Sequence, residues 1–328
     1  MKILYAIQGT GNGHLSRAMD VVPCLANHGA VDVLLSGIQA DLILPFPVQF
    51  RLNGLSFIFG KNGGVDIWET FRRSKIRRLI KEIEGLPVTD YDLVINDFEP
   101  VSAWACNFRD QPCIGLSHQL AVLDKQSPKP KEIDVLGHFI LKNYAPPTTR
   151  YGFHFRAYNS RIFTPVIRQQ IRQLECRDDD HYTVYLPAYD DARLLKFLSM
   201  FPDVRWEVFS KHNHTAYQDG NIYIHPIHNE KFIQSMATCT GILCGAGFET
   251  PAEALFLKKK LMVIPMTNQY EQHLNAAALA EMGVPVMRNI HPKHKEVVNR
   301  WLLDDRMVEV DYPDQTQEII DQIIEKHK

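Results

Sequence analysis

The sequence lacks three features that would narrow its function at once: a long apolar run, paired cysteines and a strong net charge. No apolar stretch approaches the roughly 20 residues that a membrane-spanning helix needs. The six cysteines form no Cys-x-x-Cys pair, which argues against a zinc ribbon or a disulfide framework and favours reduced thiols. Because 36 lysines and arginines are balanced by 38 acidic residues, the net charge of −2 gives no overall attraction to nucleic acid, and we expect no such partner.

The N-terminal residues also give no sign of a secretion signal. Residues 2–7 are too few for the apolar core of such a signal, and a glycine loop follows them directly, as it does after a first core strand. We therefore expect a cytoplasmic protein. Its 328 residues are enough for two ordinary domains, each with a core of its own.

Short β-branched runs alternate with amphipathic stretches along the chain, which predicts βα units and parallel sheets. In the first half we expect strands at 2–7, 31–36, 92–96 and 112–117, and helices at 15–28, 67–84 and 100–109. In the second half we expect strands at 182–186, 204–210, 221–225, 241–244 and 261–264, and helices at 190–200, 229–237, 250–257 and 270–282. A break between about 145 and 180, where Pro146 and Pro147 resist both helix and central strand, predicts α/β domains at 1–160 and 161–313. Ligands of such sheets bind beyond the carboxyl ends of the strands, so we expect the site in the cleft between the domains.

The first glycine loop, residues 8–18, runs from the end of a strand into a helix. Its glycines let the backbone pass close to a ligand, and the helix N-terminus offers free N–H groups. It is not the dinucleotide fingerprint, because His14 stands where that pattern needs a third glycine or alanine. A histidine at this junction can act as a general base near neutral pH. The alternatives are a structural tight turn for the loop and a capping or hydrogen-bonded role for His14.

The second loop region, from Gly241 to Gly283, has groups that suit a sugar diphosphate. A strand ends at 245–247, and a helix with Glu253 in its first turn follows. Backbone amides at that helix N-terminus attract a pyrophosphate, and the carboxylate can accept hydrogen bonds from ribose hydroxyls. The acid–amide pair Glu271-Gln272 on the next helix can read the hydroxyls of a sugar. Taken singly, each residue also has a structural explanation, since an acid in a first turn favours the helix dipole and Asn275 can simply cap or pack.

The ordered set is more specific than its members. It consists of a glycine-rich turn followed by Thr250, Glu253, Pro265, Glu271-Gln272 and Asn275-Ala276. This order resembles the donor-binding region of GT-B glycosyltransferases. These include two families: the UDP-glycosyltransferases, and the family-28 proteins, which are similar to the peptidoglycan N-acetylglucosaminyltransferase. The resemblance implies a donor site made of Ile227, Gly245, Ala246, Gly247, Phe248, Thr250, Glu253, Glu271 and Gln272. In that site Glu253 holds the ribose, the loop 245–248 meets the diphosphate, and Ile227 presents its backbone to the nucleobase.

The first loop fits the same families. Gly13-His14 resembles the Gly-His at their acceptor edge, where the histidine deprotonates the acceptor hydroxyl, and Asp97 matches the carboxylate that orients this histidine. His14 and Asp97 are thus the candidate catalytic pair. Gly11, Gly13 and His118 are candidates for the acceptor side.

The resemblance covers nearly the whole chain and implies an activity as well as a fold. The fold is two Rossmann-like domains facing a cleft, with a C-terminal helix at 314–328 that packs back on the first domain. The activity is transfer of a sugar, with inversion, from a nucleoside diphosphate sugar, expected to be a UDP-sugar, to an unidentified acceptor hydroxyl. The resemblance implies no cofactor.

Two departures leave the nucleobase and the sugar undetermined. Residues 186–190 lack the glycine-rich loop of the peptidoglycan enzyme, and Glu271 stands where the families usually have aspartate. Two rival functions stay open on the sequence. One is a UDP-sugar 2-epimerase, whose acidic and arginine signature we do not find, and the other is a nucleotide-sugar-binding protein without catalysis.

The remaining charged groups suggest no metal and one surface of interest. The paired histidines at 212 and 214, 225 and 228, and 291 and 294 have no closely placed cysteine or acid, so we expect no metal site. The segment 67–84 is a basic amphipathic helix, with Arg72, Arg73, Arg77 and Arg78 opposite an apolar stripe. The simpler interpretation is that these cations are solvated on the outer side of the helix. The alternative is peripheral contact of the helix with the inner surface of a membrane.

Overall fold

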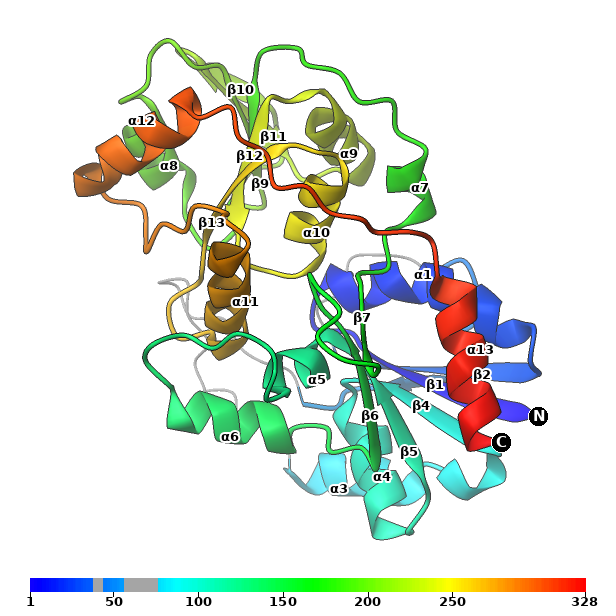
Figure 1. Cartoon of the computed structure of the whole chain (residues 1–328). Helices are drawn as coiled ribbons and strands as arrows, with labels where there is room; N and C mark the ends of the chain where they lie inside the picture. The colour runs from blue at the N-terminus through cyan, green and yellow to red at the C-terminus, as the bar shows by residue number, and fades with distance from the viewer. Residues whose placement is uncertain (38–43, 56–75) are drawn as a thin grey trace.

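The computed structural model describes residues 1–37, 44–55 and 76–328 (Figure 1). It contains two sheets, each built from one half of the chain and flanked by helices. Within these residues no helix combines the length and the apolarity that crossing a membrane would require. The prediction of a two-sheet α/β fold is confirmed.

The first sheet has seven strands, all paired in parallel, in the order β3-β2-β1-β4-β5-β6-β7. They are β1 (Lys2–Gln8), β2 (Ala30–Ser36), β3 (Phe50–Leu52), β4 (Leu93–Asp97), β5 (Cys113–Leu116), β6 (Thr149–Phe153) and β7 (Ile162–Phe163). In the register of β1 and β4, Ile7 lies opposite Asp97. The loop that follows β1 and the carboxylate that ends β4 therefore meet at one edge of the sheet.

The second sheet has six strands in the order β10-β11-β9-β8-β12-β13, and only the edge strand β10 is antiparallel. The strands are β8 (Tyr182–Tyr185), β9 (Trp206–Ser210), β10 (Tyr217–Asp219), β11 (Ile222–Pro226), β12 (Gly241–Gly245) and β13 (Lys260–Ile264). The strand β12, which leads to the second glycine loop, is central and apart from Gly245 fully buried. Buried strands of this kind hold the loops at their ends in fixed positions.

The helices cover both sheets. In the first half they are α1 (Asn12–Ala26), α3 (Ile76–Gly85), α4 (Pro100–Phe108), α5 (His118–Leu123) and α6 (Val135–Asn143). In the second half they are α7 (Gln169–Arg172), α8 (Asp191–Leu198), α9 (Asn229–Thr238), α10 (Glu249–Phe256), α11 (Tyr270–Glu281), α12 (Lys295–Leu303) and α13 (Thr316–His327).

The last helix returns to the first half of the chain, where α13 lies beside α1 (Figure 1). Asn27 donates to Gln317 at 2.7 Å, and the His28 Nε2 lies 2.6 Å from an Asp321 carboxylate oxygen. Beneath these contacts α13 buries Ile320 and three further isoleucines. The change from the first sheet to the second falls between β7 and β8, and the domain limits at 160 and 313 stay a prediction.

The expected basic helix at 67–84 is described only in part. Residues 67–75, which include Arg72 and Arg73, lie outside the described residues. From Ile76 onward α3 buries Ile83 against the core, whereas Arg77 is exposed. Leu79 packs partly against the same core, whereas Ile76 and Ile80 are 47% and 46% exposed.

Candidate active site

His14 and Asp97, predicted as a pair from distant parts of the sequence, are in contact. The loop after β1 turns at Gly11, whose φ of 131° suits glycine, and His14 then falls in the first turn of α1. Its Nδ1 lies 2.9 Å from Oδ1 of Asp97. The carboxylate is fully buried, whereas 13% of the His14 side chain is exposed. The imidazole is therefore held at Nδ1 and keeps a small part of its surface accessible.

Arg17, one helical turn after His14, is the main partner of Asp97. Its Nη2 donates to both carboxylate oxygens at 2.8 and 2.9 Å, and its Nε donates to Oδ2 at 3.2 Å. Burial alone would raise the pKa of Asp97, but Arg17 and His14 hold that pKa below its usual value. The carboxylate thus stays ionised in the interior. The sequence did not single out Arg17, although its spacing of three from His14 places both on one helix face.

The same arginine reaches the second half of the chain. Its Nη1 donates to Glu249 at 2.6 Å, at the start of α10. The backbone of Gly13 also approaches this carboxylate so closely that an added Cβ would lie 2.6 Å from Glu249 Oε2. The two glycine loops therefore meet through Glu249, another residue that the sequence did not single out.

Gln119 makes a second link between the halves. It lies in the first turn of α5, and its Nε2 is 3.3 Å from His14 Nε2 and 3.2 Å from Glu271 Oε2. Glu271 stands in the first turn of α11. A single amide is thus within reach of the predicted base and of a predicted sugar-binding carboxylate.

His118 lies inside the contact between the halves. Its ring stacks on Phe248 with centroids 3.8 Å apart, and its Nε2 lies 2.6 Å from Asn275 Oδ1. The other ring nitrogen lies 2.8 Å from the carbonyl oxygen of Phe153. Burial lowers the pKa of His118. With both nitrogens occupied and 1% of the residue exposed, His118 serves as a packing contact between the two sides.

The second glycine loop connects β12 to α10. Asn275 Nδ2 donates to the Ala246 carbonyl at 3.0 Å, and Gln272 Oε1 accepts from the Met266 backbone at 2.9 Å. These amides hold the loops after β12 and β13 in place. An added Cβ at Gly247 would meet nothing within 4 Å, so the backbone there borders open space.

The remaining predicted donor residues differ in exposure. Ile227 follows β11 and is 44% exposed, whereas Phe248 is buried and Thr250 lies half-buried in the first turn of α10. Gly245 is the last residue of β12. Gly245, Phe248 and Thr250 therefore lie at the junction of β12 and α10.

Glu253, expected to hold a ribose, is bound to an arginine in this structure. Arg168 donates from Nε to Oε1 at 2.5 Å and from Nη2 to Oε2 at 2.8 Å, so each carboxylate oxygen has a partner. Glu253 is 3% exposed, and burial raises its pKa although Arg168 opposes the shift. Arg168 precedes α7 and also donates to Asn229 at 3.2 Å. Nothing in the sequence pattern indicates this pair, whose members are 85 residues apart.

Within residues 1–37, 44–55 and 76–328, no group of three histidine, cysteine or acidic side chains is arranged to hold a metal ion. The paired histidines of the sequence accordingly form no such cluster there.

Comparisons with known proteins agree with the two-sheet architecture. Residues 1–304 match the family model described as glycosyl transferase family 1. Similar solved structures include MurG of Acinetobacter baumannii, at a TM-score of 0.58 and 14% identity over 99% of each chain. UGT89C1 of Arabidopsis thaliana, complexed with UDP, has a TM-score of 0.58 and 14% identity, and the match covers 99% of this chain and 94% of that one. The glycosyltransferase VinC in complex with dTDP has a TM-score of 0.52 and 11% identity, over 100% of this chain and 95% of that one. None of the curated proteins matches the sequence.

Proposed function

Because the chain belongs to glycosyl transferase family 1 and is a glycosyltransferase with two Rossmann-like domains of the GT-B type, we propose that it takes its sugar from a nucleoside diphosphate donor. Membership supports glycosyl transfer over the epimerase and the binding protein without catalysis. Similar proteins bind UDP or dTDP in their solved structures, which supports this donor class. We propose UDP as the nucleotide and an acceptor hydroxyl of unidentified origin.

The contact that best supports the proposal is the position of Gln119. Its amide is 3.3 Å from the imidazole of His14 in the first half and 3.2 Å from the carboxylate of Glu271 in the second. A base beside a sugar-binding group is what transfer between two bound substrates requires, since reacting groups must lie within about 3–3.5 Å of each other.

In the proposed mechanism the acceptor oxygen attacks the anomeric carbon from the side opposite the diphosphate. His14 Nε2 takes the hydroxyl proton as the new C–O bond forms. The bond to the diphosphate breaks at the same time, and the diphosphate leaves with the electron pair, so the anomeric configuration inverts. Backbone amides at the N-terminus of α10 stabilise the negative charge that develops there.

Asp97 and Arg17 act as positioning residues in this scheme. A carboxylate at Nδ1 accepts that N–H and leaves the Nε2 lone pair free for the acceptor proton. Three hydrogen bonds from Arg17 fix the orientation of this carboxylate. Arg17 Nη2 also lies 3.1 Å from His14 Nδ1. In the proposed tautomer Nδ1 carries its proton toward Asp97 and accepts nothing from Arg17.

On the donor side we propose that Glu253 binds the ribose and that Glu271 and Gln272 bind the transferred sugar. An ionised carboxylate has about four lone-pair sites, so ribose hydroxyls can bind Glu253 while Arg168 stays in place. The loop 245–248, Thr250 and Ile227 complete the proposed contacts with the diphosphate and the base.

Replacing Glu253 tests this assignment. Glu253→Gln is expected to weaken UDP binding by about 1–3 kcal/mol, the usual loss when a hydrogen bond to a charged group is removed. Isothermal titration calorimetry with UDP gives the measurement. Glu281→Gln changes an exposed carboxylate of α11 in the same way and should leave the affinity unchanged. A folded Glu253→Gln protein with wild-type affinity would remove Glu253 from the donor site.

We also propose that transfer needs no metal ion. The leaving diphosphate would then be stabilised by backbone amides alone, and EDTA is expected to leave the rate of UDP release from a UDP-sugar unchanged. A loss of rate that Mg²⁺ or Mn²⁺ restores would contradict this part of the mechanism.

We propose a cytoplasmic location, in keeping with a soluble nucleotide-sugar donor. Peripheral contact of segment 67–84 with a membrane stays a prediction, because its first nine residues lie outside the described part of the chain.

A further inference from the structure

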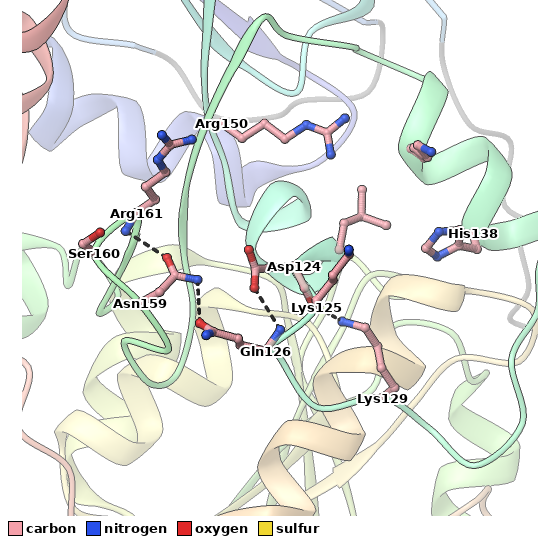
Figure 2. Close-up of a pocket in the computed structure, with 11 residues that line it drawn as sticks. Asp124, Lys125, Gln126, Lys129, His138, Arg150, Asn159, Ser160 and Arg161 are labelled. Carbon is pink, nitrogen blue, oxygen red and sulfur yellow. Dashed lines mark hydrogen bonds between the residues drawn. The ribbon is translucent and has the colours of Figure 1, made fainter.

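A basic pocket lies at the C-terminal end of α5, about one helical turn beyond Gln119 (Figure 2). Its volume is about 770 Å³, and it is bounded by α5, the loop that follows, α6, β6 and the loop before β7. It is lined by Leu123, Asp124, Lys125, Gln126, Lys129, His138, Lys142, Arg150, Asn159, Ser160 and Arg161. Nothing in the proposed transfer mechanism uses these side chains.

The pocket concentrates positive charge in a protein whose net charge is −2. Five lysines and arginines line it, against the single carboxylate of Asp124. Lys129 Nζ is occupied by the carbonyl oxygens of Val122 and Asp124, at 2.7 and 2.6 Å. In the described ranges, Arg150 and Arg161 have no acidic side chain within 4.0 Å of their guanidinium groups. These two cations are therefore available to an anionic partner.

The helix α6 beside the pocket exposes an apolar face. Val135, Leu136 and Phe139 of α6 are 57–77% exposed, and Ile133, two residues before the helix, is 63% exposed. Such a cluster of large apolar side chains in water is unusual. At about 100° per residue, Lys142 falls next to Val135 and Phe139 on the helix surface. The opposite side of α6 packs inward, with the Gly137 backbone against Tyr270. The apolar face and the basic pocket thus adjoin along one helix.

We propose that this docking face, the apolar residues of α6 together with the basic pocket, binds the surface of a bilayer that contains anionic phospholipids. Apolar side chains beside cations are the combination by which interfacial helices enter the headgroup region. Lipid phosphates would lie at Arg150, Arg161 and Lys142, and Leu136 and Phe139 would enter the acyl boundary.

Two other possible partners would each account for only part of the docking face. A soluble anion would use the cations and leave the apolar face in water. A second copy of the chain, in the usual two-fold contact, would bring the same patch of both copies together, so the cations would face cations. A bilayer with anionic lipids matches both the apolar residues and the cations of the docking face.

Co-sedimentation of the full chain with phosphatidylcholine vesicles, with and without phosphatidylglycerol, tests the proposal. Binding is expected only with phosphatidylglycerol, at low salt, and should fade as salt rises. Arg150→Glu/Arg161→Glu should lower the partition coefficient at least about fivefold for each cation. Leu136→Ser/Phe139→Ser removes the inserted groups and should also release the protein from the vesicles.

Matched controls lie in the second half of the chain. Lys211→Glu/Lys295→Glu makes the same charge change, and Leu303→Ser/Met307→Ser removes two exposed apolar residues. Both should sediment like the wild type. Calorimetry with UDP should give one affinity for all variants, so that a failure of docking is separate from a failure of the donor site.

Several results would overturn the proposal. The first is an absence of vesicle binding at low salt. The second is vesicle binding that persists in both Arg150→Glu/Arg161→Glu and Leu136→Ser/Phe139→Ser, which would come from another surface such as segment 67–84. A third is a charge effect without an apolar effect, with inorganic phosphate displacing the vesicles, which would make the pocket a soluble-anion site. A fourth is a dimer in sedimentation velocity that Leu136→Ser/Phe139→Ser dissociates.

Discussion

His14→Ala is expected to lower turnover by about 10²–10⁴-fold, the usual scale of general-base catalysis. Nδ1 of the imidazole lies beside the Asp97 carboxylate, and Nε2 faces the Gln119 amide. An acceptor hydroxyl could replace this amide beside Nε2. UDP affinity should barely change, because the proposed nucleotide contacts lie in the second half of the chain. Release of UDP from a UDP-sugar measures the rate, with an acceptor once one is found and as slow hydrolysis before then.

The companion variant Asp97→Asn separates the base from its orientation. Turnover should fall by less than in His14→Ala, since the imidazole remains but loses the carboxylate that fixes its tautomer. A His14→Ala protein that works at the native rate would place the base elsewhere. One that is folded but has lost UDP binding would make His14 a donor ligand and contradict the mechanism.

Arg17→Leu is expected to lower the free energy of unfolding by about 3–5 kcal/mol, as measured by chemical denaturation. Removing one partner of a buried ion pair leaves the other charge uncompensated, and Asp97 is fully buried. Arg300→Leu, at an exposed site in α12, should be close to neutral. The double variant Arg17→Leu/Asp97→Asn should recover part of the loss, because the only carboxylate then left without Arg17 is that of Glu249, which is 27% exposed. Wild-type stability in Arg17→Leu would show that Asp97 does not depend on this arginine.

Acid unfolding gives an independent check on the same contact. In the wild type Arg17 and His14 hold the pKa of Asp97 below its unfolded value of about 3.9, despite burial. The stabilisation is therefore present above about pH 4 and is lost as the pH falls through the folded pKa. Without Arg17 the burial that raises this pKa is less opposed, so Arg17→Leu should begin to unfold at a higher pH.

Much of the fold could be predicted because its strands are buried runs between helices. The prediction of strands at 2–7 and 241–244 differs from β1 and β12 by one residue. The prediction missed a strand directly after Pro146 and Pro147, where we expected the break between the domains to begin. The structure adds β6 two residues later, because Thr148 N donates to Cys113 O and begins the pairing. Proline is compatible with a position just before a strand.

The site was predictable where a residue follows a strand and not where its partner is distant. Asp97 ends β4 and His14 follows the neighbouring β1 after a short loop, so the strand order brings both to one edge of the sheet. Arg17 and Glu249 are 232 residues apart, and Gln119 and Glu271 are 152 apart. A lone charge on an amphipathic helix looks like a solvated side chain in the sequence. Only the packing of one half on the other gives these residues partners.

Arg17 connects the two proposed binding sites, that of the acceptor at His14 and that of the donor at the start of α10. One guanidinium binds Asp97, which we propose orients the base, and through Nη1 it binds Glu249 at the end of the proposed donor loop. Any change in the distance between the halves therefore alters the hydrogen bonding of Asp97 as well as that of Glu249. Linkage makes such an effect reciprocal: if UDP binding tightens the Arg17–Glu249 contact, acceptor binding at His14 must change UDP affinity by the same factor. Cooperative binding of the two substrates would then follow from one side chain, without a separate regulatory site.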